Sequence, residues 1–244
     1  MKKLLLLFLL ILSFNLNAQT VKIAAAANLN FAIEEIKTKY ESQNPGTKVV
    51  VSLGSSGTLY QQITNGAEFD IFMAADKKFP QKLKEENFVS GEVRTYVLGK
   101  LVLWSNMVDV SKGIEILADK PVNRVSIAKP ELAPYGDRAL QCLKHYNLFE
   151  KVKDKIVYAD NISQAAQFAQ TGNAEAAFIA LSLAIAPEMK GNYFELDPKS
   201  YTPIEQALIL LKTGQDNPEA AKFLKFVFSS ECKAIFEKYG YLVP

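Results

Sequence analysis

The sequence predicts an α/β protein with mainly parallel sheets, and two observations support this. Short apolar runs suited to buried strands alternate with segments whose apolar residues recur at helical spacing. The alternation continues from residue 19 to the end of the chain, and no repeat, low-complexity stretch or flexible linker interrupts it. Alternating strands and helices are typical of sheets whose parallel strands are joined by helical crossovers.

Three strand–helix pairs are predicted in the first part of the chain. In the first of them Ile33, Ile36 and Tyr40 recur at helical spacing, with charged residues between them. Asn-Pro-Gly at 44–46 ends that helix, because the residue before a proline disfavours the α region. The pairs are Val21–Ala26 with Phe31–Ser42, Lys48–Leu53 with Thr58–Thr64, and 69–76 with Lys77–Asn87.

The second part of the chain repeats the order of strand, turn and helix after a long apolar run. If the molecule has two lobes, we expect the chain to cross between them as extended strands near 95–100 and 200–206. The predicted segments are the apolar run Tyr96–Trp104, a strand–turn–helix in 125–149, another in 155–180 that ends in the strand Ala176–Ala180, an apolar strand in 203–214, and one or two helices in Asn217–Tyr239.

Residues 1–18 have the three-part form of a secretory signal peptide. Two lysines precede the apolar run Leu4–Leu12, and polar residues follow before a cleavage point predicted after Ala18. The apolar run is too short to span a bilayer, and no later run is long and apolar enough. The sequence therefore predicts an exported, soluble, periplasmic protein with no membrane insertion after cleavage.

The charge balance argues against a nucleic-acid or membrane-surface partner. The chain has 28 Lys and Arg against 26 Asp and Glu, and removal of Lys2 and Lys3 with the leader brings the two counts level. A chain with balanced charges has no long-range attraction to polyanions. Cys142 and Cys232 are the two cysteines. We expect them to be unpaired core residues, because two cysteines do not make a disulfide framework.

Four junctions between a strand and the following helix have a small or polar turn. Ligands of open α/β sheets bind outside the carboxyl ends of strands, and a helix N-terminus there offers unpaired N–H groups and a partial positive charge. The same Ser and Asn residues are also preferred helix N-caps, so each junction taken alone is explained without a ligand. The junctions are AAAANLNFA (24–32), LGSSGTLYQQ (53–62), APYGDRALQ (133–141) and YADNISQAAQ (158–167).

Three stretches together resemble the periplasmic molybdate-binding proteins of ABC transporters: KIAAAANLNFAIEEI, SLGSSGTLYQQITNGAEFDIFMAADKKF and IFEKYGYLVP. The resemblance covers essentially all of the chain after residue 18. It implies a two-lobed periplasmic binding protein of type II, with 19–97 plus 205–244 as lobe 1, 98–204 as lobe 2, and two crossing strands as the hinge. It further implies a monomer that binds molybdate or tungstate in the cleft, needs no cofactor or metal ion, and delivers the anion to a membrane permease.

The resemblance also implies which residues bind the anion. Asn28 and Ser56 stand where the family has polar donors after its first two strands, and Ala27 precedes the first of them. Tyr135 and Ile162 match positions that give only a backbone N–H. One departure is Ala180, which stands where many members have a Tyr. The hydrogen bond that this Tyr hydroxyl would donate is expected to be missing, or to be replaced by one from Ser182 or Asn28.

Other ligands and another class of protein remain open on the sequence alone. Sulfate or another oxyanion suits the same donors, and Asp137 and Asp160 lie near enough to the turns to accept the proton of monohydrogen phosphate. An exported hydrolase is the alternative from another class. His145 is the one histidine, and its place near a helix end indicates a solvated residue rather than a general base.

Overall fold

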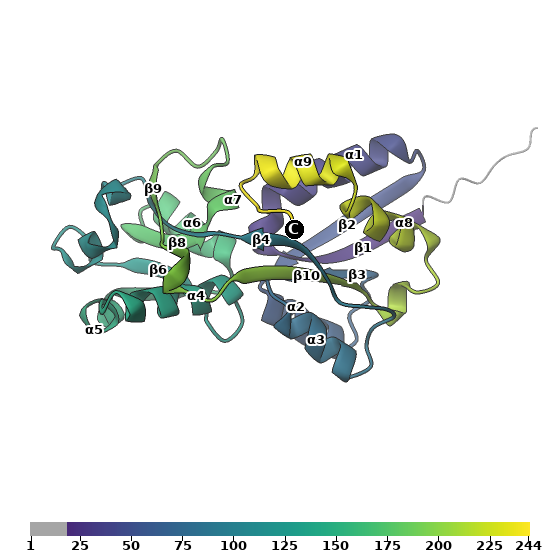
Figure 1. The fold of residues 1–244 in the computed structure, drawn as a ribbon, viewed down its shortest axis with the longest axis horizontal. Coiled ribbons are helices and arrows are strands. Elements are labelled where there is room, and N and C mark those ends of the chain that lie inside the picture. Colours follow the sequence, from purple (N-terminus) through teal and green to yellow (C-terminus); the bar gives the residue numbers. More distant parts are fainter. Residues whose placement is uncertain (1–18) are drawn as a thin grey trace, which may run out of the picture.

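Two five-stranded sheets, each covered by helices, make up residues 19–244, the part of the chain that this computed structural model describes (Figure 1). The sheets lie at opposite ends of the molecule, and two long strands run between them. We call the two halves the first and the second lobe. The predicted signal peptide, residues 1–18, lies outside the described residues. The two-lobed α/β fold agrees with the prediction.

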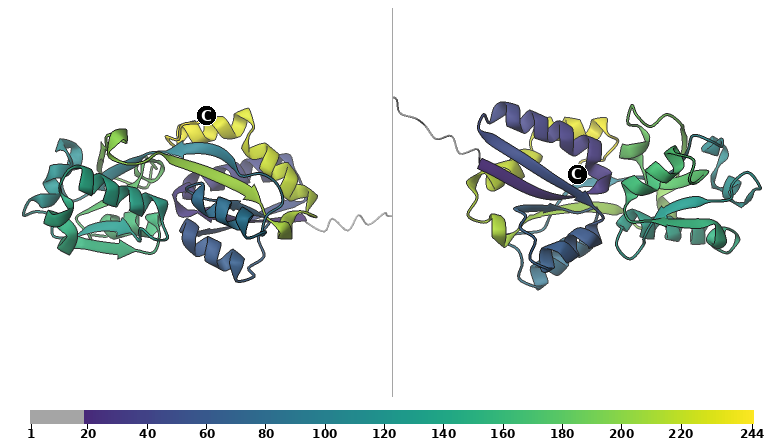
Figure 2. Two further views of the ribbon diagram at one scale, coloured as in Figure 1. Left: turned by 60° about the horizontal axis from the view of Figure 1, so that its bottom comes forward. Right: turned by 180° about the vertical axis from the view of Figure 1, so that it is seen from behind.

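The first lobe holds the N-terminal and C-terminal parts of the described chain. Helices α1, α8 and α9 cover one face of its sheet, and α2 and α3 cover the other (Figures 1 and 2). The strand order is β2 (Thr47–Gly54), β1 (Gln19–Ala26), β3 (Ile71–Met73), β10 (Ile204–Leu210) and β4 (Arg94–Gly99). The helices are the 3₁₀ turn η1 (Ala27–Leu29), α1 (Asn30–Gln43), α2 (Ser56–Thr64), α3 (Lys78–Glu85), α8 (Pro218–Val227) and α9 (Ser230–Lys238).

The second lobe is built from the middle of the chain. Its strand order is β7 (Ile156–Ala159), β6 (Val125–Ala128), β8 (Ala176–Ala180), β5 (Leu101–Ser105) and β9 (Asn192–Glu195). Its helices are α4 (Pro134–His145), α5 (Phe149–Val152), α6 (Ile162–Gln170) and α7 (Leu181–Ala184). Short 3₁₀ turns complete the connections in both lobes.

The strand directions correct one detail of the prediction, because both sheets are mixed rather than mainly parallel. In the first sheet β1 runs parallel to β2 and β3, whereas β10 runs antiparallel to β3 and β4. In the second sheet β6 runs parallel to β7 and β8, whereas β5 runs antiparallel to β8 and β9. The antiparallel pairs arise where the chain leaves one lobe and returns, since the outgoing and incoming strands run in opposite directions.

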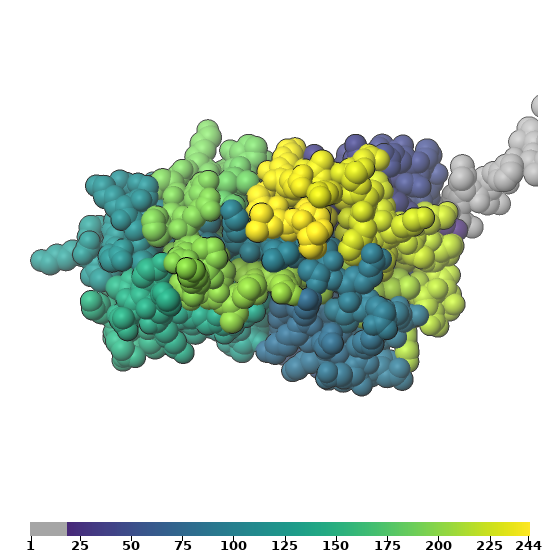
Figure 3. Space-filling model, viewed as in Figure 1, coloured from purple at the N-terminus to yellow at the C-terminus, as the bar shows by residue number. Residues whose placement is uncertain are grey.

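The crossing strands are β4 and β10, which pair with each other up to Gly99 and Ile204. The predicted apolar run at 96–104 divides at Lys100, so that β4 belongs to the first sheet and β5 to the second. The C-terminal tail adds a further bridge: the Leu98 N–H donates to the Leu242 carbonyl at 2.7 Å, and the Leu242 N–H donates back at 3.0 Å. The C-terminal segment (yellow) therefore lies over the crossing strands (Figure 3).

Apolar cores fill both lobes and continue across the junction between them. The core of the second lobe centres on Trp104 and Phe178 and extends to Ala27 and Ala75 of the first lobe. Both cysteines are buried and unpaired, Cys142 in the second-lobe core and Cys232 in a first-lobe core. Within residues 19–244 no helix is long and apolar enough to cross a membrane.

Candidate functional site

The five predicted binding residues line one small pocket between the lobes. All four strand–helix junctions singled out in the sequence contribute to it, together with Ala75 after β3. Within residues 19–244 no charged side chain lines this pocket. The lining residues are Ala26, Ala27, Asn28, Gly54, Ser55, Ser56, Ala75, Ala133, Pro134, Tyr135 and Ile162. We call it the inner pocket.

Hydrogen bonds between the lobes hold the inner pocket closed. The Gly57 N–H in α2 donates to the Leu132 carbonyl at 2.8 Å. On the other side, Ser163 Oγ donates to the Ala27 carbonyl at 2.9 Å, and Ser182 Oγ donates to the Asn28 carbonyl at 2.9 Å. The described conformation is therefore one in which both lobes meet around the pocket.

Ser55 and Ser56, at the start of α2, have different hydrogen-bond partners. Ser55 is the N-cap, and its hydroxyl oxygen accepts the Thr58 N–H at 3.2 Å. Ser56 is almost fully buried, and its Oγ accepts the Ala75 N–H at 2.9 Å. The hydroxyl proton of Ser56 has no acceptor among residues 19–244, so it is free to donate into the inner pocket. The cap explanation therefore applies to Ser55 and not to Ser56.

Three helix N-termini converge on the inner pocket. Ser56, Tyr135 and Ile162 lie in the first turns of α2, α4 and α6, where N–H groups have no acceptor within the helix. Asn161 caps α6 by accepting the Gln164 N–H at 3.0 Å, and no side chain caps α4. The pocket is thus polarised by helix ends, and the free hydroxyl proton of Ser56 is a further donor.

Asn28 makes hydrogen bonds with two residues that were not predicted from the sequence as part of the site. Its Nδ2 donates at 2.9 Å to Gln206 Oε1 on the crossing strand β10 and at 2.9 Å to Tyr241 Oη in the C-terminal tail. Its Oδ1 is buried and has no hydrogen-bond partner among the described residues. In this orientation the Asn28 amide nitrogen points toward the hinge. The donor role that the resemblance implies for Asn28 stays a prediction.

Tyr241 lies in the region where the sequence lacks the family's usual Tyr. Its hydroxyl donates to the Asn28 carbonyl at 2.8 Å and lies 3.0 Å from Ser182 Oγ. Burial raises the pKa of Tyr241, so its hydroxyl stays neutral. Ser182, expected as one replacement for the missing bond, contacts Asn28 instead of lining the inner pocket. Tyr241 was missed because residues so far apart in sequence meet only in the folded chain.

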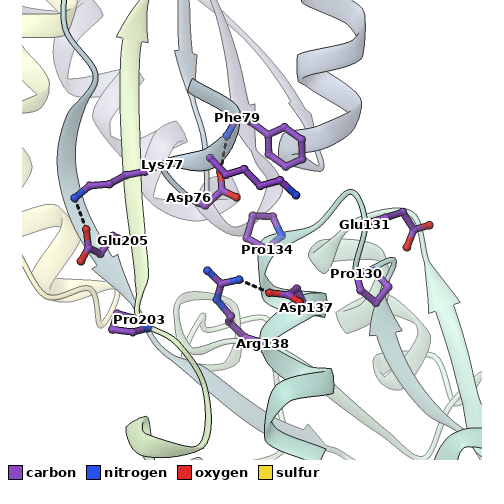
Figure 4. Close-up of a pocket in the computed structure, with 11 residues that line it drawn as sticks. Asp76, Lys77, Phe79, Pro130, Glu131, Pro134, Asp137, Arg138, Pro203 and Glu205 are labelled. Carbon is purple, nitrogen blue, oxygen red and sulfur yellow. Dashed lines mark hydrogen bonds and ion pairs between the residues drawn. The ribbon is translucent and has the colours of Figure 1, made fainter. Parts of the chain in front are cut away.

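A larger, charged cavity opens beside the inner pocket (Figure 4). It has a volume of about 540 Å³, and Pro134 lines both spaces. Asp76, Lys77 and Phe79 reach it from the first lobe, whereas Glu131 and Arg138 reach it from the second. The Arg138 guanidinium pairs with the Asp137 carboxylate and donates to the Thr202 carbonyl at 3.2 Å. Burial raises the pKa of Asp76. We call this space the outer cavity.

The residues considered for other chemistry do not reach the inner pocket. His145 is exposed at the last position of α4. Asp160 pairs with Lys129 at 2.7 Å on the surface, and Asp137 lines the outer cavity. Within residues 19–244 no group of three or more His, Cys, Asp or Glu side chains is placed to hold a metal ion.

Comparison with known proteins decides the family. Residues 21–242 match the model of the bacterial extracellular solute-binding protein family. The chain belongs to this family. It is 38% identical to the molybdate-binding protein ModA of Azotobacter vinelandii over 92% of this chain and 90% of that one. It is 39% identical to ModA of Rhodobacter capsulatus over 90% of this chain and 86% of that one.

A solved structure agrees with this membership of the solute-binding protein family. The periplasmic molybdate-binding protein of Azotobacter vinelandii superposes with a TM-score of 0.86 at 33% identity, covering 92% of this chain and 99% of that one. The two lobes with a pocket between them are therefore the architecture of a solute-binding protein. The resemblance inferred from the three sequence stretches is confirmed.

Proposed function

We propose that this solute-binding protein captures molybdate or tungstate in the inner pocket and delivers it to the membrane permease of an ABC importer. The observation that carries the proposal is a pocket that has no charged side chain within the described residues and is lined by four strand–helix junctions, three of which are the N-termini of α2, α4 and α6. The ModA relatives, matched over about nine-tenths of the chain, support molybdate as the anion.

The chemistry of the anion suits such a pocket. Molybdate and tungstate carry no proton at neutral pH, so they accept hydrogen bonds and donate none. Hydrogen bonds to a charged acceptor contribute about 1.5–3 kcal/mol each, so several of them offset the cost of desolvating a dianion. A carboxylate would repel the anion, and the lining has none within residues 19–244.

Each of the five residues has a proposed role. Ser56 donates its hydroxyl and its N–H, and Tyr135 and Ile162 donate backbone N–H groups from the second lobe. Asn28 and Ala27 complete the first-lobe side. Because both lobes supply donors, a bound anion stabilises the closed form, in which the Gly57–Leu132 hydrogen bond is made.

We also propose how the chain divides into two lobes and where the protein is located. We divide the chain into 19–97 plus 205–244 as lobe 1 and 98–204 as lobe 2, and the pairing of β4 and β10 in the first sheet supports this to within two residues. We also propose cleavage after Ala18, export to the periplasm and a monomeric state. Family membership supports a transport role without catalysis.

Sulfate is the second candidate, because it is also a tetrahedral dianion. The sulfate-binding protein SubI of Mycobacterium tuberculosis shares the fold, with a TM-score of 0.76 at 14% identity. Phosphate is less suited, because its proton needs an acceptor and neither Asp137 nor Asp160 lines the inner pocket.

A thermal-shift panel of molybdate, tungstate, sulfate and phosphate on residues 19–244 tests the proposal. A ligand at a hundredfold excess over its dissociation constant raises the free energy of unfolding by about 2.7 kcal/mol. We expect molybdate and tungstate to shift the midpoint at micromolar concentrations. A panel in which neither anion shifts it would contradict the proposed function.

A further inference from the structure

The orientation of the Asn28 carboxamide conflicts with the ligand that the inner pocket suits. Asn28 lines the pocket, yet both protons of its Nδ2 are donated away from it, to Gln206 and Tyr241, neither of which lines the pocket. The remaining polar atom, Oδ1, is an acceptor with no partner among the described residues. An oxyanion that only accepts hydrogen bonds would be repelled by it.

We propose that in the anion-bound protein the carboxamides of Asn28 and Gln206 both stand the other way round, with Gln206 as the positioning residue that fixes this turned state. In that state Asn28 Nδ2 donates to the anion and Gln206 Nε2 donates to Asn28 Oδ1. The Tyr135 hydroxyl then donates to Gln206 Oε1. This inference rests on the proposed function, because it assumes an anion in the inner pocket.

The neighbours of Gln206 accommodate this exchange. The described arrangement has Gln206 Nε2 donating to Tyr135 Oη at 3.0 Å, while the Tyr135 proton has no acceptor among residues 19–244. After the exchange that proton is donated to Gln206 Oε1. Tyr96 Oη lies 3.1 Å from Gln206 Oε1 and 3.3 Å from the Ala74 carbonyl. In the turned state it accepts from Gln206 Nε2 and donates to Ala74.

Asn28 keeps its own partners in the turned state. The two ends of a carboxamide have the same size and shape, so the exchange alters the direction of hydrogen bonds and not the packing. In the turned state the Tyr241 hydroxyl donates to Asn28 Oδ1 instead of to the backbone carbonyl of Asn28. The Ser182 hydroxyl still donates to that backbone carbonyl. The internal network loses no hydrogen bond overall, and the Asn28 N–H gains the anion.

The network links the pocket to the hinge. Asn28 belongs to the first lobe, Gln206 to the crossing strand β10 and Tyr135 to the second lobe, and all three side chains are buried. A Cβ on Gly99 of the other crossing strand would lie 2.1 Å from Tyr135 Oη and 2.7 Å from Gln206 Nε2. The absence of a side chain at Gly99 therefore leaves room for the hydrogen bond between Gln206 and Tyr135, which joins the crossing strand β10 to the second lobe.

Side-chain amide NMR of the ¹⁵N-labelled protein tests the inference directly. The amide protons of Gln206 and Asn28 are assigned from the signals lost in Gln206→Glu and Asn28→Asp. With saturating molybdate, we expect nuclear Overhauser contacts from the Gln206 amide protons to the Tyr96 ring. If, in the molybdate-bound protein, the Gln206 amide protons lie beside the Tyr135 ring and the Asn28 amide protons lie beside Tyr241, the inference is wrong.

A double-mutant cycle gives a second readout that a merely structural role would not produce. We expect Gln206→Met, similar in size and unable to donate, to weaken molybdate binding about tenfold. Because Gln206 acts through Asn28, the double variant with Asn28→Ala should bind no more weakly than Asn28→Ala alone. If the two losses of molybdate affinity multiply in the double variant, or if Gln206→Met alone leaves the affinity unchanged, the inference is contradicted. Absence of molybdate binding by the wild-type protein would instead contradict the proposed function.

Discussion

Ser55 and Ser56 are neighbours with different partners. Ser55 caps α2, whereas Ser56 binds the Ala75 N–H and keeps a proton for the pocket. The sequence indicated Ser56 through a resemblance, and the cap geometry gives the physical reason for preferring it. Geometry of this kind depends on where the helix begins, which composition and spacing locate only to within a residue or two.

Ser56→Ala is expected to weaken molybdate binding about tenfold to a hundredfold. It removes a hydroxyl bond to a buried anion, worth about 1–3 kcal/mol, and leaves an anion oxygen unpaired. The matched control is Ser55→Ala, which should lower the free energy of unfolding by about 1 kcal/mol through loss of the cap while affecting affinity much less. Calorimetric titration and urea unfolding of both variants check this. A reversed pattern would mean that Ser55, not Ser56, faces the anion.

At the scale of elements, the pattern of strands and helices was predictable and their partners were not. The predicted strand 69–76 shortens to Ile71–Met73, and the apolar run 96–104 divides between two sheets at Lys100. Hydrophobic pattern identifies buried strands, but the sheet that a strand joins depends on pairing across the fold. Gln206 and Tyr241 could not be predicted as neighbours of Asn28 for the same reason.

Gly57→Ala is expected to hinder closure of the lobes more than it changes the stability of the protein. A Cβ there would lie 2.8 Å from Leu132 Cα of the second lobe, so closure would require backbone to move. It would also lie 2.9 Å from Phe79 Cζ of the first lobe, whose ring would have to shift in the open form as well. Within α2, alanine favours the helix by up to about 1 kcal/mol. Because the shift of the Phe79 ring offsets this gain, we expect the free energy of unfolding without ligand to change by no more than about 1 kcal/mol, and molybdate binding to weaken at least tenfold. Equal affinity in variant and wild type would show that the lobes need not approach so closely.

The helices α4 and α9 carry the two cysteines, in separate lobes. Burial raises the pKa of Cys142 and of Cys232 to about 11 in each case. We therefore expect neither thiol to react with iodoacetamide at neutral pH in the folded protein, and both to react after denaturation without reductant. Intact-mass measurement counts the labels. Labelling that appears only after reduction would mean that the two form a disulfide.

At the scale of the whole molecule, the network around the inner pocket is neutral. Burial raises the pKa values of Tyr96, Tyr135 and Tyr241. A raised folded-state pKa means that the unfolded chain loses these protons first, so stability falls as pH rises above about 10, the ordinary pKa of tyrosine. Binding and stability are expected to stay level between about pH 6 and 8. Urea midpoints and titrations across this range check it, and a step in either quantity between pH 6 and 8 would contradict it.

The two lobes and the pocket residues were predicted from the resemblance to the molybdate-binding proteins, and the four junctions could be recognised because each is local. Strand, small turn and helix start occur within ten residues at each junction, and the fold brings four such junctions together. The mixed sheets and the hydrogen-bond directions of Asn28 depend on contacts between distant parts of the chain. They required the folded structure.

We expect the inner pocket to select a large tetrahedral oxyanion, and a competition titration of molybdate against sulfate tests this most directly. The two anions share charge and shape, so discrimination comes from their size relative to donors fixed by two lobes. With the smaller sulfate, contacts from one lobe lengthen, and two weakened charge-assisted bonds cost more than tenfold in affinity. We expect one molybdate per chain, displaced readily by tungstate and poorly by sulfate. Sulfate that competes equally at equal concentration would contradict this expectation.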